Sequence, residues 1–426
     1  MKLNDSLISK KIIEILIIIF PVALLFSNIL AEILILLFIL FYFFKTKFNN
    51  FFLDLKQPII FYLIIFWFYL ILNTIINIEN KPSLERSIFF IRFPLLILSL
   101  NFIINTLNLN LKKIFNFWIF IFIIICIDLF IQFFTHSNIL GFKAIQQGAV
   151  YRLGGFMDDE LKISNLLYHF GALIFSFYFS KKPKTKLNST ILSLFFLIFI
   201  TVSIYLTAER ANFITIASFI SLLIIFLAFK NKKFFYTYFS IFLILLSFAF
   251  LSKNNHSKRM INDLVNNIQL FKIDKNENFL KKDSHYFAHY STAYQIYKKN
   301  VFFGVGLKNF RKFCNDSSFD DKIHDNWQNR KCATHPHNFY FEMLSEIGLI
   351  GLILITSFFI FSFYTFFNFY KTKGNSFLLL NTFILVVYFI PFLPKGSFFS
   401  NWNAMIFWFI FSFIYSSYHK LLKQKN

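Results

Sequence analysis

Two histidines in the last third of the chain have the residue type and spacing for acid–base chemistry. The segment 333–351 reads ATHPHNFYFEMLSEIGLIG, so Pro336 separates His335 from His337. A proline disfavours helical backbone at the residue before it, which places both histidines on a turn and not on one helix face. Asn338 suits an N-cap, and the spacing predicts a helix that begins there and continues into an apolar segment. A neutral imidazole accepts protons near neutral pH, so this turn is the predicted reactive site.

Further polar residues are candidates for supporting roles around His337. Glu342 and Glu346 follow on the predicted helix, where they either orient His337 or form the solvated face of that helix. His285 and His289 share one face of a helix predicted from Ser284 to Lys299, and solvent or loop packing explains them equally well. The predicted catalytic residue is therefore His337, and the predicted supporting residues are His335, Asn338, Glu346, His285 and His289.

The composition is that of a membrane protein. Of the 426 residues, 57% are hydrophobic and 22% aromatic, and the mean hydropathy is +0.59. Apolar runs of about 18 residues or more mark membrane helices. The first run, residues 12–26, lacks a small-residue cleavage site and is predicted to be an uncleaved helix. The net charge of +22 indicates anionic lipid and phosphate partners, and no nucleic acid is expected, because most lysines lie in short loops between apolar runs.

The pattern predicts an all-α integral membrane protein with twelve transmembrane helices. The predicted spans are residues 12–27, 29–44, 58–76, 88–106, 114–134, 163–180, 189–206, 211–229, 234–252, 347–369, 376–392 and 400–418. Lysines gather in alternate connecting segments, which places both termini in the cytoplasm. The predicted domains are 1–252 with spans one to nine, a large periplasmic lid loop at 253–346 that carries the catalytic motif, and 347–426 with the last three spans.

Arginine is used differently from lysine in this chain. All seven arginines fall on the predicted outer side or at the outer end of a span: Arg86, Arg92, Arg152, Arg210, Arg259, Arg311 and Arg330. A guanidinium grips phosphate with two hydrogen bonds, so the pattern predicts an outward phosphate or pyrophosphate site. Arg152 and Arg210 are the best candidates, with rim salt bridges to Asp158 and Glu209 as the alternative. The first two arginines are predicted lipid anchors, and the last three are predicted lid surface.

Four other features of the sequence are candidates for a metal, intramembrane, phosphate or disulfide site. The cluster Asp158, Asp159 and Glu160 is either a metal site or, as we favour, the cap of span six. Asp128 and Gln132 lie one turn apart in span five, and an intramembrane carboxylate is a functional candidate. The turn FFGVG is a weak match to a phosphate cradle, and close backbone packing explains it better. Cys314 and Cys332 lie in the outer loop and are predicted to form a disulfide, with unpaired thiols or a zinc site with His335 and His337 as alternatives.

These motifs resemble the O-antigen ligase and O-antigen polymerase superfamily of bacterial envelope enzymes. The similarity is most specific at His337 and Asn338, which are followed after nine residues by Gly348-x-x-Gly351. It extends to the sequences GVGLKNF, YRLGGFMDDE and LTAERANF, and to the single large lid before span ten.

The resemblance implies a metal-independent, inverting glycosyltransferase of the bacterial inner membrane whose active site is periplasmic. It implies a glycan donor on undecaprenyl pyrophosphate, a glycan acceptor such as lipid A-core, and no cofactor. By the same resemblance, His337 is the catalytic residue, and Arg152 and Arg210 hold the donor pyrophosphate. An imidazole can accept the proton of a sugar hydroxyl, and guanidinium groups can stabilise the leaving pyrophosphate.

This sequence departs from the family pattern at two places. The start of the predicted lid helix reads SHYFAHY and lacks an arginine that such ligases often carry, so either His285 or His289 replaces it or the donor contact differs. Glu209 stands where the family commonly has serine, and it is predicted to pair with Arg210 and weaken its grip on phosphate.

Two other functions stay open at this point. A Wzy-type O-antigen polymerase uses the same donor, and the sequence hardly separates it from a ligase. A transporter of lipid-linked glycans predicts paired charges near the bilayer midplane and broken helices in corresponding halves of the chain. Few such charges and no internal repeat are present in this sequence, so we favour an enzyme that ligates glycan to an outer acceptor.

Overall fold

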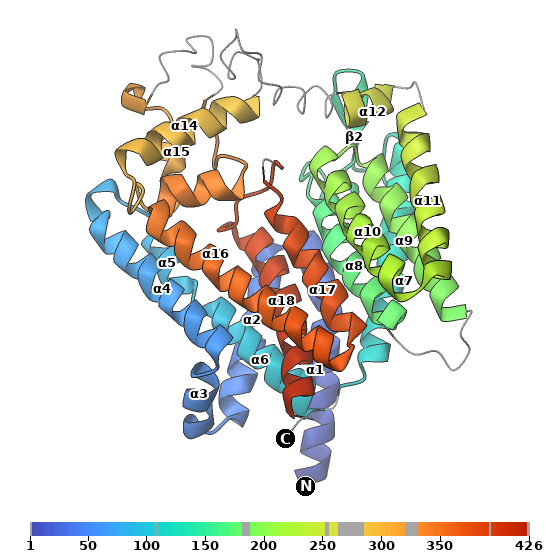
Figure 1. The fold of residues 1–426 in the computed structure, drawn as a ribbon, viewed down its shortest axis with the longest axis horizontal. Coiled ribbons are helices and arrows are strands. Elements are labelled where there is room, and N and C mark those ends of the chain that lie inside the picture. Colours follow the sequence, from blue (N-terminus) through green and yellow to red (C-terminus); the bar gives the residue numbers. More distant parts are fainter. Residues whose placement is uncertain are drawn as a thin grey trace. The chain divides into compact units, whose positions relative to one another are not determined.

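The computed structural model describes residues 2–107, 109–180, 188–251, 255–262, 285–319, 331–391 and 393–423. Within these residues the fold is helical apart from one short β-hairpin (Figure 1). The chain divides into two compact units, each with its own core. Unit 1 comprises Met1–Leu34, Leu107–Lys272 and Thr372–Tyr388, and unit 2 comprises Ile35–Thr106, Ile273–Lys371 and Phe389–Asn426.

Each of the twelve apolar segments predicted as spans contains a helix in the described part of the structure. Six helical segments are long and apolar enough to cross a bilayer: Asn28–Lys45, Pro58–Ile76, Leu84–Thr106, Leu111–Thr135, Arg210–Lys230 and Phe339–Lys373. Two shorter apolar helical segments, Leu192–Leu206 and Ser376–Phe389, lie among the described residues as well. The protein is therefore a helical membrane protein, and the full count of twelve spans stays a prediction.

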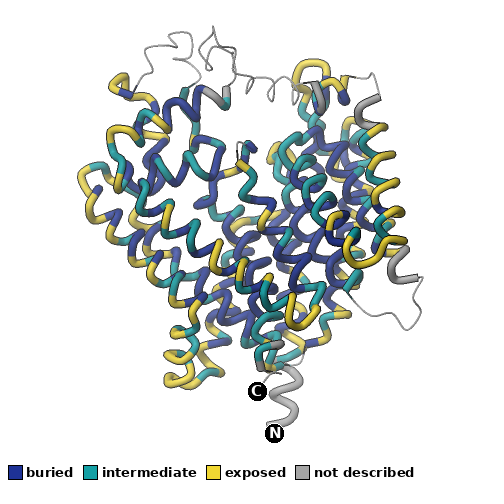
Figure 2. Tube along the Cα trace, viewed as in Figure 1, coloured by how far each residue is buried: buried dark blue, intermediate teal, exposed yellow. Residues whose placement is uncertain are grey.

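Unit 1 is built around helix α8, which is buried along nearly its whole length (Figure 2). Its elements are α1 (Lys2–Phe26), α7 (Leu111–Thr135), β1 (Ile145–Gln147), β2 (Val150–Arg152), η2 (Gly155–Met157), α8 (Ile163–Ser180), α9 (Asn188–Leu206), α10 (Arg210–Lys230), α11 (Lys232–Leu251), α12 (Asn255–Ser257), η3 (Lys258–Asn262) and α17 (Ser376–Val386). Helices α7, α9, α10 and α17 pack against α8. The Tyr168 hydroxyl donates to the Ile384 carbonyl at 2.7 Å and so joins α8 to α17 inside this apolar core.

Unit 2 is built around the pair α6 and α18, which pack along one another. Its elements are α3 (Phe48–Leu55), α4 (Pro58–Ile76), η1 (Ile78–Asn80), α5 (Leu84–Phe89), α6 (Arg92–Thr106), α14 (His285–Lys299), α15 (Phe310–Phe313), η4 (Ser317–Phe319) and α18 (Asn401–Lys423), together with most of α2 (Asn28–Lys45) and α16 (Phe339–Lys373). The short η6 (Val387–Phe389) ends at the boundary between the units. Trp408 is fully buried among aromatic rings that include Phe93 and Phe359.

Helix α16 is the element that positions the predicted reactive turn, and it is broken near its start. Its backbone leaves helical geometry at Gly348, with φ 69° and ψ −172°. Segment 301–306 fills this break with four backbone hydrogen bonds, from Val305 N–H to Ser345 O (2.9 Å), Gly306 N–H to Glu346 O (2.9 Å), Leu349 N–H to Val301 O (2.8 Å) and Ile350 N–H to Phe302 O (3.3 Å). A helix break leaves backbone groups without helical partners, and this segment supplies the partners.

Two glycines make this close approach possible. A Cβ atom at Gly304 would lie 2.6 Å from the Ser345 carbonyl oxygen, and a Cβ atom at Gly348 would overlap the Phe302 carbonyl. Both glycines have φ values near +65° that residues with side chains rarely adopt. The FFGVG turn is therefore packed tightly against α16, which is the explanation that the sequence favoured over a phosphate cradle.

We predict that Gly348→Ala destabilises the protein more than Gly374→Ala does. Gly374 has a similar φ of 67°, but nothing lies within 4 Å of its Cβ position. The control should therefore lose only the left-handed backbone penalty of roughly 1 to 2 kcal/mol. Gly348→Ala adds a backbone overlap, and we expect a further loss of roughly 1 to 3 kcal/mol. Thermal unfolding of both variants in detergent measures the difference, and equal losses would contradict the packing described above.

Candidate functional site

The predicted reactive turn lies in unit 2 and is held by backbone hydrogen bonds. Asn338 Oδ1 accepts from the N–H groups of Tyr340 (2.9 Å) and Phe341 (3.3 Å), so it caps α16 as the sequence predicted. His337 has left-handed backbone geometry, with φ 55°. Its carbonyl accepts the Lys395 N–H at 2.8 Å, which fixes the turn to the segment before α18. Non-glycine residues in such geometry are uncommon and collect at functional sites.

Three imidazole rings meet at this turn. The ring centroids of His335 and His337 are 4.1 Å apart, and those of His289 and His337 are 5.4 Å apart. His289 comes from α14, whose predicted range Ser284 to Lys299 agrees with the observed His285–Lys299 within the described residues. The side chain of His285 lies outside the part of the structure that is described. The structure thus brings together three of the four histidines that the sequence singled out.

Hydrogen bonding distinguishes the roles of His335 and His337. His335 Nε2 lies 3.2 Å from the Lys395 carbonyl, which only accepts, so we assign the ring proton to Nε2. His335 Nδ1 then accepts from the Thr334 hydroxyl at 3.0 Å. Both nitrogens of His335 are therefore occupied. No described side chain or carbonyl hydrogen-bonds to the ring of His337, which leaves this ring able to take a proton.

Both imidazoles are neutral at physiological pH. Burial, followed by the nearby His335 and His289, lowers the pKa of His337 from 6.5 to about 3, and Glu342 opposes the shift. Burial and the charge of Lys308 are the largest causes that lower the pKa of His335 to about 4. Burial disfavours the charged imidazolium, and a neutral imidazole can act as an acceptor.

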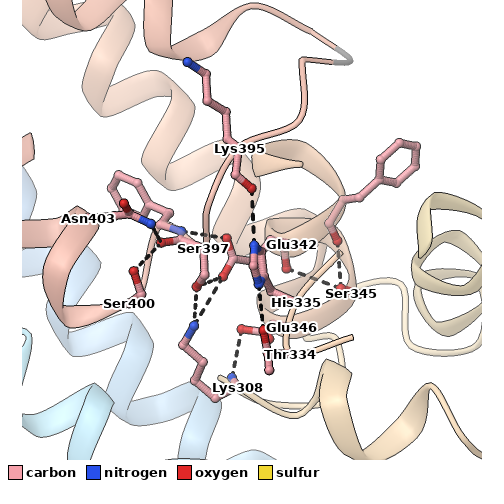
Figure 3. Close-up of polar contacts among 12 residues, drawn as sticks. Lys308, Thr334, His335, Glu342, Ser345, Glu346, Lys395, Ser397, Ser400 and Asn403 are labelled. Atoms are coloured by element: carbon pink, nitrogen blue, oxygen red, sulfur yellow. Dashed lines mark hydrogen bonds and ion pairs between the residues drawn. The ribbon is translucent and has the colours of Figure 1, made fainter. Parts of the chain in front are cut away.

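A buried polar cluster lies beneath the turn, among Lys308, Glu342, Ser397 and Phe398 (Figure 3). The Ser397 hydroxyl donates to Glu342 Oε1, and Lys308 Nζ donates to the Ser397 oxygen. The Phe398 N–H donates to Glu342 Oε2 at 2.8 Å, and Lys308 Nζ lies 3.6 Å from Glu342 Oε1. We name these four residues the polar clamp.

The two glutamates of α16 do not form a solvated face. The exposed fraction is 1% for Glu342 and 0% for Glu346. Glu346 Oε2 accepts the backbone N–H of Lys308 at 2.8 Å, so its described contact is with Lys308 and not with His337. Of the two alternatives for these glutamates, the solvated face is therefore wrong, because the helix break brings segment 301–308 over this side of α16.

A disulfide joins Cys314 and Cys332, whose Cα atoms are 5.1 Å apart. Cys314 is buried in an apolar cluster with Ala293 of α14 and Phe310 of α15. The neighbouring Lys331 carbonyl lies 3.1 Å from His289 Nδ1. The disulfide therefore restrains the segment that leads into the histidine turn, and it removes the Cys332 thiolate that the zinc alternative required.

Arg152 and Arg259 lie together in unit 1, at the β-hairpin of β1 and β2, and we name them the arginine cluster. The sequence predicted no strand here, but Ile145–Gln147 pairs antiparallel with Val150–Arg152. Arg152 donates to Glu209 through Nε (3.0 Å) and Nη2, and to Gln147 Oε1 through Nη1 at 3.1 Å. Arg259 also donates to Gln147 Oε1, at 3.0 Å. Arg259 was predicted to be lid surface, but it is half-buried and shares an acceptor with Arg152 because α12 packs against β2.

The carboxylate partner of Arg152 is Glu209, and not Asp158, which the salt-bridge alternative gave to Arg152. Arg210 is the first residue of α10, directly after Glu209. The acidic cluster is placed at the surface, where Glu160 forms an exposed ion pair with Lys162. The acidic cluster, the β-hairpin with Arg152 and helix α10 all belong to unit 1, whereas the histidine turn belongs to unit 2. The approach of His337 to the two arginines therefore stays a prediction.

Asp128 and Gln132 have structural roles that the sequence did not distinguish from function. Asp128 accepts from the Ile139 N–H at 3.0 Å and from Asn138 Nδ2 at 3.3 Å. Gln132 Oε1 accepts the Gly155 N–H at 2.9 Å. These side chains of α7 therefore hold both ends of the segment that carries Arg152.

The remaining arginines differ in their surroundings. Arg92 donates to Asn401 Oδ1 at 3.1 Å and lies over the Phe93 ring, so it joins α6 to α18. Arg311 is exposed and Arg86 is half-buried, and Arg330 lies outside the described residues.

The fold and these two polar groups define a helical membrane protein with an imidazole site and a guanidinium site. Residues 194–356 match the family described as O-antigen ligase, and this range includes Arg210, Lys308 and the whole histidine turn. The resemblance to the O-antigen ligase family is therefore confirmed over that range. No curated protein matches the chain. The family is glycosyltransferase-like, which supports an enzyme with a ligase or polymerase type of function.

We predict that acid destabilises the protein through these histidines. The unfolded chain binds their protons near the ordinary pKa of 6.5, whereas the folded protein resists protonation until about pH 4 for His335 and about pH 3 for His337. Stability is therefore present above about pH 6.5 and falls below it, by about 1.4 kcal/mol per pH unit for each histidine. Thermal unfolding at a series of pH values measures this loss. It should be smaller in the double variant His335→Gln, His337→Asn, and an identical loss would contradict the assignment.

Proposed function

We propose that this protein transfers a glycan from undecaprenyl pyrophosphate to an outer acceptor such as lipid A-core, as an O-antigen ligase does. The observation that carries the proposal is the unoccupied, neutral imidazole of His337 within the O-antigen ligase segment. The protein acts in the bacterial inner membrane with the histidine turn on the periplasmic side and both termini in the cytoplasm. Residues 253–346 form a lid between the first nine spans and the last three.

His337 is the base in this proposal. A hydroxyl of the acceptor sugar gives its proton to the imidazole while its oxygen forms a bond to the anomeric carbon of the donor. The bond between that carbon and the pyrophosphate oxygen breaks, and undecaprenyl pyrophosphate leaves with the electron pair. One direct displacement inverts the anomeric centre. A donor that is already activated requires neither a metal ion nor another cofactor.

The pKa of His337 bears on this role. A general base works best when its pKa is near the working pH, and about 3 is low for that purpose. A bound diphosphate brings negative charge, and negative charge raises the pKa of an imidazole. Donor binding would therefore strengthen the base at the time when the acceptor hydroxyl must be deprotonated.

Arg152 and Arg210 bind the pyrophosphate in this proposal. Charge on the leaving oxygen grows as the glycosidic bond breaks, and preorganised guanidinium groups stabilise that charge. Gln147 and Glu209 orient Arg152 before substrate arrives. Because Glu209 holds two of its nitrogens, the donor must either replace this carboxylate or bind beside it.

We predict that His337→Asn abolishes glycan transfer while the protein remains folded. Asparagine tolerates left-handed backbone better than alanine does, so this variant removes the base without adding backbone strain. We expect transfer to fall by a factor on the order of 100 or more. The measurement is made in membranes of the source cell with the gene deleted and the variant supplied, using their own lipid-linked glycan. Near-normal transfer in a folded variant would overturn the role of His337.

The same cells separate ligase from polymerase. Loss of a ligase leaves the lipid core without glycan, while polymer accumulates on the carrier. Loss of a polymerase leaves the core capped by single repeats. A Wzy-type polymerase is the second candidate because it would use the same donor chemistry and the same residues.

We predict that Arg152→Lys and Arg210→Lys each lower transfer roughly tenfold to a hundredfold despite the retained charge. Lysine is a point charge and cannot form the paired hydrogen bonds of a guanidinium. Arg86→Lys serves as the matched control because Arg86 lies in unit 2 and outside the arginine cluster. Unchanged transfer in both test variants would count against a two-pronged grip on the donor.

A further inference from the structure

Segment 395–398 connects the polar clamp to both histidines of the turn. At one end, the Lys395 N–H donates to His337 O at 2.8 Å, and the Lys395 carbonyl accepts from His335 Nε2. Three residues later, the Phe398 N–H donates to Glu342 Oε2. Glu342 in turn lies on α16 only five residues after His337. The histidine turn, the start of α16 and segment 395–398 are therefore joined in a closed ring of contacts, in which the turn and the segment fix one another.

Burying the charged groups of the polar clamp carries a large desolvation cost. Its carboxylate and ammonium group are both buried, with side-chain exposed fractions of 1% for Glu342 and 9% for Lys308. Removing two charges from water carries a large desolvation penalty that is offset only by close pairing and further hydrogen bonds. Here both oxygens of Glu342 are occupied, by the Ser397 hydroxyl and by the Phe398 N–H. Removing one partner would leave an unpaired buried charge, so the network constrains the positions of all its members.

Left-handed backbone geometry occurs at two residues of this ring of contacts, one in the polar clamp and one in the histidine turn. Lys308 has φ 64° and His337 has φ 55°, and neither residue is a glycine. Such positions persist only where the surroundings determine them. Lys308 is held by Glu346 through its N–H and by Ser397 through its amine. His337 is held by the Lys395 N–H.

We propose that Ser397, Glu342 and Lys308 are positioning residues, which hold segment 395–398 so that it fixes the backbone of His337 and the Nε2–H form of His335. The inference rests on the proposed function only in that His337 is the group being positioned. Ser397 is the junction, because its hydroxyl accepts from Lys308 and donates to Glu342. Lys308 and Glu342 form an ion pair at 3.6 Å, which is longer than a hydrogen bond, and the Ser397 hydroxyl bridges the two groups.

The test is Ser397→Ala in the full-length protein, with two readouts. Histidine labelled with ¹⁵N reports the tautomer of each neutral ring, and His335→Gln identifies the His335 signals. We expect wild-type His335 to be a single Nε2–H tautomer and Ser397→Ala to show a mixture. Glycan transfer in membranes should fall on the order of tenfold, because misplacement of a catalytic group by about 1 Å has effects of this size or larger.

Ser345→Ala is the matched control. Ser345 is a buried serine of α16 whose hydroxyl donates only to carbonyls of its own helix, at Phe341 and Glu342, among the described residues. It should preserve the His335 tautomer and transfer. Ser397→Thr retains a hydroxyl and should restore both readouts. In Lys308→Met combined with Glu342→Gln, the loss of transfer should be smaller than the product of the single losses, because neither charge remains unpaired.

Two results would overturn the proposal. The first is a folded Ser397→Ala variant with an unchanged His335 tautomer. The second is a changed tautomer with undiminished transfer, which would show that the clamp does not serve the reaction. Failure of the proposed function gives a different pattern, because His337→Asn would then retain transfer whatever the tautomer of His335.

Discussion

The break in α16 at Gly348 is the constraint on which the histidine site depends. It exposes carbonyl and N–H groups that a continuous helix would satisfy internally, and segment 301–306 supplies their partners. This segment delivers Lys308 to the buried side of α16, next to Glu342 and Glu346. The clamp, segment 395–398 and the turn follow from that placement. A backbone irregularity thus decides where charged side chains can be buried in an apolar protein.

The histidine turn is a site of low charge within a strongly basic chain. The pKa values of His335 and His337 lie well below 6.5, mainly because both half-buried rings are partly removed from water. Lys395, which holds their backbone and ring, is itself buried, and burial lowers the pKa of its amine to about 7. The amine of Lys395 points away from the histidine rings (Figure 3), and an anion that enters beside the two imidazoles would shift them toward the charged form.

Local signals in the sequence predicted local structure well. Pro336 and Asn338 determine the turn and the cap through backbone geometry of adjacent residues, and apolar runs determined the helices. The clamp was not predictable in this way, because Lys308, Glu342 and Ser397 are 34 and 55 residues apart and meet only through tertiary packing. In the sequence, Lys395 was only one more charge in an outer loop. Gly304 and Gly348 leave room for the close approach of segment 301–306 to α16, but the sequence does not show that the two belong together.

The arginine cluster illustrates the same limit. Sequence reasoning identified Arg152 by its residue type, but its partners depend on a hairpin of two three-residue strands. Strands this short leave little alternation to detect, so Gln147 and Arg259 were not linked to it. Asp128 and Gln132 are polar residues of a predicted span, and the structure shows why they are tolerated there. Each is satisfied by the backbone of the segment that it anchors.

The disulfide also bears on how the protein matures. Disulfides persist in oxidising compartments and are rare where glutathione keeps thiols reduced. Under the proposed topology, newly made protein reaches the membrane with Cys314 and Cys332 as thiols, and the segment before the histidine turn is then not yet restrained by the disulfide. The bond closes after this part of the chain has been translocated. The site would therefore be completed only after translocation, so that the enzyme becomes active on the side of the membrane where its bond can form.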